Sequence, residues 1–203
     1  AAKVLSYYTK KNAYTIHKKI YRQKSSAQGF GDFALDRNLH KNTFFIIDEA
    51  SMISNRSGES SIFGSGHILD DLIEYVYSES SCKMILIGDT AQLPPVGLDI
   101  SPALNKSVLE GFFLSVSEVY LTEVIRQAAS SGIFHNATNI RNLISADTPE
   151  TIQPEFSLRS FDDIERIYGE DLIETISDSY NQSGIEETIV VCRSNKRDRK
   201  SVV

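Results

Sequence analysis

The chain has 203 residues, enough for one full domain or for a domain and part of another. Hydrophobic residues make up 41% and charged residues 24%, as in ordinary globular proteins, and no apolar run is long enough to span a membrane. No signal peptide follows Ala1, so we expect a cytoplasmic protein without membrane contact. Cys82 and Cys192 stand alone beside or within apolar segments, which predicts buried thiols rather than a disulfide or a metal site.

The net charge of −6 argues against nucleic acid as a partner, but the charges are unevenly distributed. Residues 1–31 contain no acid and hold seven cations: Lys3, Lys10, Lys11, Lys18, Lys19, Arg22 and Lys24. Residues 193–200 are also basic. A polyanion-binding face and a solvated helix face explain the first segment equally well, and the second can be a disordered chain end.

The first half of the chain predicts alternating strands and helices. Thr15 is a candidate N-cap for a short amphipathic helix that ends at Tyr21. The other expectations, in chain order, are a loop over 25–41 with a small hairpin near 30–35, a strand over 43–48, a mobile Ser/Gly-rich insertion over 54–66, a helix over 67–77 and a strand over 84–87. This order predicts a right-handed parallel crossover.

The second half is less regular. We expect, in chain order, a loop with one or two helical turns over 98–114, a strand over 119–121, a helix over 132–144, a linker over 148–154, a short strand over 156–158, a helix over 162–177 and a buried strand over 189–192. The whole pattern is α/β, with a first domain over 1–125 and part of a second over 126–203.

The most informative stretch is the strand over 43–48, which ends in two acids. Its consecutive apolar residues predict burial on both faces, as in a parallel sheet. Asp48 and Glu49 then lie at the carboxyl end, where open α/β sheets bind ligands. One acid can hold Mg²⁺ and the other can activate water, as in the Walker B element of a P-loop NTPase. A strand that simply ends in a charged turn is an equally good explanation of this stretch alone.

A second strand strengthens the ATPase interpretation. Residues 84–87 are followed by a Gly-Asp turn, by Gln92 and by Pro94-Pro95. A stiff turn of this kind can present the Gln92 amide to a γ-phosphate, although hairpin turns also use prolines.

Six segments, in order, resemble superfamily 1 DNA helicases of the RecD-like branch, the type of the exodeoxyribonuclease V alpha subunit. Residues 47–52 resemble motif II, 88–97 motif III and 121–127 motif IV. Weaker likenesses are 1–3 to the end of motif Ia, 15–17 to a Thr-x-His element, and 190–196 to the strand and loop before the later motifs. The resemblance implies a P-loop NTPase (RecA-like) parallel sheet with helices on both faces, and part of a second RecA-like domain.

The resemblance also implies roles for individual residues. Asp48 would hold Mg²⁺, Glu49 would be the general base, Gln92 would sense the γ-phosphate of ATP, and Arg126 would be an arginine finger. Taken alone, Arg126 fits a surface salt bridge better; together with Asp48 and Gln92 it fits the finger.

The expected DNA contacts are weaker. Lys3 would contact single-stranded DNA through motif Ia, whereas for His17 a packed, hydrogen-bonded side chain is the better explanation.

The family pattern is incomplete at both ends. No Gly-x-x-x-x-Gly-Lys-Ser/Thr occurs in the chain, and the last motifs are absent. We therefore expect a piece of a longer ATP-dependent helicase, inactive by itself, that acts on single-stranded DNA with ATP, Mg²⁺ and other helicase-nuclease subunits as candidate partners. The alternative is a non-catalytic nucleic-acid-binding or interaction module with a degenerate helicase fold.

Overall fold

The computed structural model describes residues 2–24, 32–56, 62–125, 130–145, 153–158 and 161–192. The chain divides into two compact units, Ala1–Leu121 and Thr122–Val203, and each is described by itself. The assignment of RecA-like domains to 1–125 and 126–203 remains a prediction.

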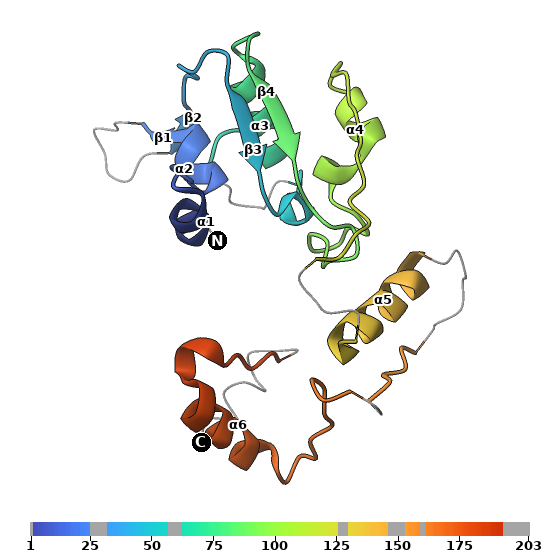
Figure 1. Ribbon diagram of the computed structural model, residues 1–203. Helices are drawn as coiled ribbons and strands as arrows, with labels where there is room; N and C mark the ends of the chain where they lie inside the picture. Colours follow the sequence, from blue (N-terminus) through green and yellow to red (C-terminus); the bar gives the residue numbers. More distant parts are fainter. Residues whose placement is uncertain are drawn as a thin grey trace. The chain divides into compact units, whose positions relative to one another are not determined.

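The first unit is built on two parallel strands and one helix (Figure 1). Strand β3 (Phe44–Ile47) pairs in parallel with β4 (Lys83–Leu86), and α3 (Ile68–Tyr77) connects them. The buried face of α3 carries Leu69, Leu72, Ile73 and Val76, the spacing of one apolar helix face. The predicted strand-helix-strand order with a parallel pair is therefore confirmed.

The expected burial of β3 on both faces is wrong for the described part of the chain. Phe45 and Ile47 pack into the core, whereas Phe44 and Ile46 are each 62% exposed. Ile85 and Ile87 of the neighbouring strand segment are exposed as well. The reason is that α3 packs against one face of the pair, so alternate side chains meet solvent. A RecA-like sheet with helices on both faces is not seen among the described residues.

A small antiparallel hairpin lies beside this core. Helix α1 (Ala2–Thr9) and helix α2 (Ile16–Ile20) precede β1 (Tyr21–Gln23), which pairs with β2 (Phe33–Leu35). Thr15 caps α2 as predicted, since its Oγ1 accepts a hydrogen bond from the Lys18 N–H at 3.3 Å.

The described part of the predicted insertion is packed rather than loose. Phe63 forms an isolated parallel bridge with Phe33, and the two rings stack with centroids 4.6 Å apart. Residues 57–61 of this insertion lie outside the described residues, so the prediction of a mobile insertion over 54–66 is tested only at its two ends.

Helix α3 receives its N-terminal cap from a distant residue. His67 occupies the N-cap position without a side-chain cap bond. Asn55 replaces it: its Oδ1 accepts from the Leu69 and Asp70 N–H groups at 3.2 and 3.3 Å, and its Nδ2 donates to Asp70 Oδ1 at 2.7 Å. The cap therefore ties the start of the 54–66 insertion to the helix that follows it.

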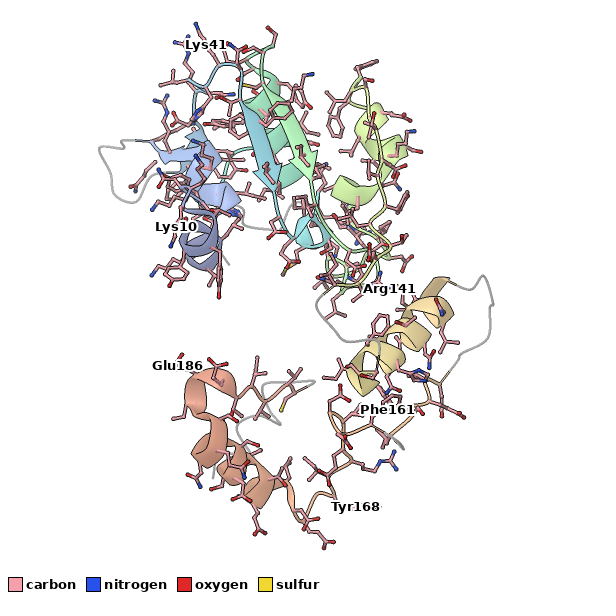
Figure 2. The ribbon with its side chains drawn as sticks, in the orientation of Figure 1. Lys10, Lys41, Arg141, Phe161, Tyr168 and Glu186 are labelled. Atoms are coloured by element: carbon pink, nitrogen blue, oxygen red, sulfur yellow. The ribbon has the colours of Figure 1, made fainter. Side chains whose placement is uncertain are left out.

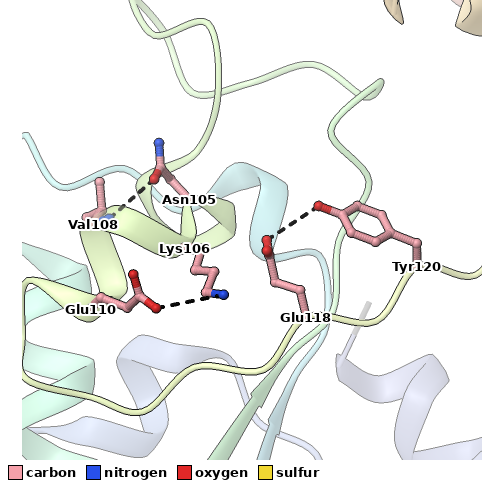
Figure 3. A network of polar contacts seen from close by, with 6 residues as sticks. All are labelled: Asn105, Lys106, Val108, Glu110, Glu118 and Tyr120. Atoms are coloured by element: carbon pink, nitrogen blue, oxygen red, sulfur yellow. Dashed lines mark hydrogen bonds and ion pairs between the residues drawn. The ribbon is translucent and has the colours of Figure 1, made fainter.

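The predicted helical turns after β4 are present as η2 (Pro102–Leu104) and α4 (Lys106–Glu110). Figure 3 shows the polar contacts here: Asn105 caps α4 through the Val108 N–H at 3.2 Å, and Lys106 pairs with Glu110 at 3.8 Å. The strand predicted over 119–121 is wrong. Its residues are exposed and pair with no described strand. The Tyr120 hydroxyl donates to the Glu118 carboxylate at 3.5 Å.

The second unit contains α5 (Gly132–Ser145), α6 (Leu172–Ser183) and η3 (Ile185–Glu187). Helix α5 confirms the prediction over 132–144, whereas the helix expected over 162–177 begins ten residues later. The reason is that Asp163 caps α5, accepting from Ser131 Oγ at 2.5 Å and from the Gly132 N–H at 2.7 Å, which holds the segment around it out of a helix.

Two strand predictions in this unit are also wrong. Residues 156–158 and 189–192 carry no strand, and the second segment is largely exposed. Cys192 is consequently exposed, contrary to prediction, while Cys82 is buried as predicted. The apolar run over 189–192 had indicated a strand, but no described neighbour supplies a hydrogen-bonding edge. The linker expected over 148–154 lies mostly outside the described residues. Among the described helices, none has both the length and the apolar character needed to cross a membrane.

Candidate active site at the carboxyl ends of the parallel strands

The parallel pairing of β3 and β4 brings two loops together at one edge. The ladder continues past both strands: the Ile87 N–H donates to the Ile47 carbonyl at 2.8 Å, and the Ala50 N–H donates to the Ile87 carbonyl at 2.8 Å. The acid turn over 48–51 and the turn over 88–92 therefore leave the sheet side by side. This edge is where an open α/β sheet binds its ligands.

The acid turn has an unusual backbone. Glu49 adopts φ 56° and ψ 40°, the left-handed region, immediately before the 3₁₀ helix η1 (Ala50–Met52). Such a conformation costs a non-glycine residue about 1–3 kcal/mol. Asp48 Oδ1 accepts the Glu49 N–H at 3.0 Å, and both carboxylates are exposed. The turn thus holds two acids in solvent at the end of a rigid strand.

Buried contacts behind the turn hold this backbone in place. Ala50 and Ser51 are buried, and the Ser101 hydroxyl lies 2.8 Å from the Ala50 carbonyl and 2.7 Å from the Ile53 carbonyl. A Cβ at Gly88 would lie 2.8 Å from the Ser51 nitrogen, so only glycine allows this approach of the two loops.

The second loop presents Gln92. The Asp89 side chain turns the backbone through a bond from the Ala91 N–H to Oδ1 at 3.0 Å, and the Gln92 N–H donates to the Asp89 carbonyl at 3.1 Å. A further turn follows, in which the Leu98 N–H donates to the Pro95 carbonyl at 3.0 Å. Gln92 is exposed, on the same edge of the sheet as Asp48 and Glu49.

The residues at this edge fit magnesium bound with a nucleotide. No described group of three or more His, Cys, Asp or Glu side chains could enclose a metal ion. Magnesium sites of nucleotide enzymes do not need such a group, because one or two carboxylates, water and substrate phosphates complete the shell. Asp48 and Glu49 supply two carboxylates, and neither forms an ion pair with a described residue.

The remaining predicted site residues are placed as follows. Arg126 lies outside the described residues, so its position relative to Gln92 is untested. Lys3 is exposed on α1. The His17 ring packs against Phe63, with centroids 4.8 Å apart, and against Tyr21 at 5.7 Å, in agreement with a packed side chain.

Sequence reasoning missed the groups that support the acid turn. Ser101 sits immediately before Pro102 and caps η2 through the Ala103 N–H at 3.2 Å. The Ser-Pro pair is an N-terminal helix signal that could have identified the cap. Its contacts with residues 50 and 53, about fifty positions away, have no signal in the sequence.

Comparison with known proteins gives one family match. A family model described as AAA domain matches residues 1–153, about three quarters of the chain. Neither the curated proteins nor the solved structures contain a match.

Proposed function

Because the chain belongs to the AAA domain family, and its matched segment is a helicase-like P-loop AAA domain, we propose that it is part of an ATP-dependent DNA helicase of the RecD-like branch. In the intact protein, ATP hydrolysis would drive movement on single-stranded DNA. The observation that carries the proposal is the shared sheet edge, where Asp48, Glu49 and Gln92 follow two paired parallel strands.

Each of these residues has a distinct task. ATP with Mg²⁺ supplies the phosphoryl group that is transferred to water. Asp48, exposed and free of ion pairs with described residues, would hold the magnesium. Glu49 would accept the proton of the attacking water, and its left-handed backbone sets the direction in which its side chain leaves the turn. Gln92 contacts the γ-phosphate and reports its presence.

Arg126 completes the proposed chemistry. A planar, permanently charged guanidinium suits a phosphate oxygen, and an arginine finger contributes on the order of 10³-fold or more in rate. Lys3 is the proposed contact with single-stranded DNA, and His17, exposed although its ring packs on Phe63, is the weaker candidate. By analogy with the RecD-like branch, we expect movement from 5′ to 3′, and other helicase-nuclease subunits are the candidate partners.

A second candidate is a non-catalytic nucleic-acid-binding module. It is favoured by one observation, that no Gly-x-x-x-x-Gly-Lys-Ser/Thr stands within these 203 residues. Hydrolysis by the 203-residue chain alone is accordingly expected to be negligible.

Phosphate release by the intact protein, with single-stranded DNA present, tests the enzyme. Glu49→Gln keeps the size of the side chain and removes the base, so turnover should fall about 10²- to 10⁴-fold. Lys83→Gln, an exposed lysine at the opposite end of β4, is the matched control and should retain full turnover. Undiminished hydrolysis by Glu49→Gln would refute the assignment of the base, and an intact protein with no turnover would favour the binding module.

A further inference from the structure

A basic pocket of about 270 Å³ lies in the first unit, between α2, the segment 36–40 and α3. Its lining includes Tyr14, Lys18, Lys19, Arg37, His40 and Tyr75. None of these residues belongs to the candidate active site.

The pocket lies at the end of the parallel pair where both strands begin, opposite the acid turn. The Cys82 thiol donates to the His40 carbonyl at 3.3 Å, and the His40 ring meets the Phe45 ring edge-on, with centroids 5.5 Å apart. His40 is therefore held beside the amino ends of β3 and β4, whereas the acid turn follows their carboxyl ends. Figure 2 shows Lys41, the next residue, at this end of β3.

Positive charge in the pocket is not neutralised within the described part of the chain. Lys18, Lys19 and Arg37 have no described carboxylate partner. Lys19 Nζ lies 2.7 Å from His40 Nε2, and since an ammonium only donates, the imidazole nitrogen accepts and the cation remains. The one carboxylate in the lining, Asp36, is already engaged: it pairs with Arg22 Nε at 3.5 Å and accepts the Arg37 N–H at 2.8 Å.

Tyr75 contributes a phenol hydroxyl. The residue is 4% exposed and lines the pocket, and no hydrogen bond from its hydroxyl to a described residue is present. Burial, with the charge of Asp36 next in importance, raises the pKa of this phenol, so the hydroxyl stays protonated and can donate.

Tyr14 adds an exposed aromatic face at the rim. The Nζ atoms of Lys18 and Lys19 each lie 5.7 Å from its ring centroid. Exposed aromatic rings interleaved with cations bind single-stranded nucleic acid, because bases stack on the rings while phosphates meet the charges.

We propose that this pocket binds a phosphate group of single-stranded nucleic acid. Lys18, Lys19 and Arg37 neutralise the phosphate, the Tyr75 hydroxyl donates to one of its oxygens, and Tyr14 stacks on an adjoining base. The volume lies just below the range of about 300–1,000 Å³ typical of small-molecule sites, which suits a phosphate with part of its sugar. The choice of ligand rests on the proposed function, but the location does not.

Fluorescence anisotropy of the 203-residue chain with labelled oligo(dT) of about 12 nucleotides, at several salt concentrations, tests the site. Arg37→Gln should weaken binding about three- to tenfold and lower the slope of log K against log salt by about 0.7, the loss of one phosphate contact. Tyr75→Phe should weaken binding ~3-fold with the salt slope unchanged, because it removes a neutral donor and keeps the ring. Lys83→Gln makes the same charge change outside the pocket lining and should have little effect.

The possible outcomes distinguish binding in the pocket from binding through overall charge, and they test the pocket independently of the ATPase. Equal effects of Arg37→Gln and Lys83→Gln, or no binding by the wild-type chain, would overturn the proposal. So would amide NMR signals of Arg37 and His40 that move with inorganic phosphate but not with oligo(dT). Far-UV circular dichroism checks that each variant is folded. Oligo(dT) binding by the 203-residue chain and turnover by the intact protein are measured separately, so a failed pocket and a failed ATPase are recognised independently.

Discussion

The Ser101 hydroxyl is the contact through which tertiary structure holds the acid turn, and Ser101→Ala removes it. Ser101 is buried, and alanine fills nearly the same volume, so the substitution opens little cavity. The single hydroxyl hydrogen lies within hydrogen-bond distance of the carbonyls of residues 50 and 53, and the oxygen accepts the Ala103 N–H.

The expected cost follows from which groups lose a partner. The Ala50 carbonyl keeps the Ile53 N–H at 3.1 Å, so it remains bonded. The Ile53 carbonyl and the Ala103 N–H lose the Ser101 bonds that the structure records for them. An unsatisfied buried polar group costs about 1–3 kcal/mol and a lost cap about 1 kcal/mol, so the free energy of unfolding should fall by about 2 kcal/mol.

Urea unfolding followed by far-UV circular dichroism measures this change. Ser107→Ala, an exposed serine on α4, is the matched control and should change the free energy of unfolding by less than about 0.5 kcal/mol. If Ser101→Ala unfolds at the same urea concentration as the control, the hydroxyl does not hold the turn and the reasoning is refuted.

Three further predictions concern the helix ends and the thiols. In thermal unfolding, Asn55→Ala should lower the free energy of unfolding by about 1–2 kcal/mol, because α3 loses its cap. Asn12→Ala, at an exposed position, should leave it unchanged. Hydrogen bonds from the Ser131 hydroxyl, and then from the Gly132 N–H, lower the pKa of Asp163. The ionised carboxylate therefore stabilises α5 fully above the ordinary aspartate pKa of about 3.9. This stabilisation is lost as the pH falls through the lower pKa of the folded state. An acid titration of the Gly132 amide signal should show this change, and Asp163→Asn should abolish it. Exposed Cys192 should react with a thiol reagent in the native chain while Cys82 stays protected, and equal rates would contradict the structure.

The sequence predicted secondary structure correctly where residues close together in the chain decide the conformation. Helix α3 follows from the apolar spacing of residues 69, 72, 73 and 76, and the Thr15 cap from a short hydroxyl side chain before an amphipathic turn. The candidate site was predictable to the same extent. Two acids after one strand and Gln92 after the next needed only the parallel pairing to share an edge.

Apolar composition alone misled the strand predictions at 119–121 and 189–192. A strand exists only where a second backbone supplies hydrogen bonds, and a run such as Ile189-Val190-Val191 does not say whether an edge is available. The helix expected over 162–177 failed for a related reason, since Asp163 serves the end of another helix.

The sequence by itself therefore determined the α/β class, the acid turn and the residues proposed to carry its chemistry, because these depend on spacing within a few positions. Tertiary structure alone decided that Gly88 touches Ser51, that Ser101 holds the turn, and that Lys19, Arg37 and Tyr75 line one pocket. These contacts join residues far apart in the chain, and only the packing of strands and helices sets the distances between them.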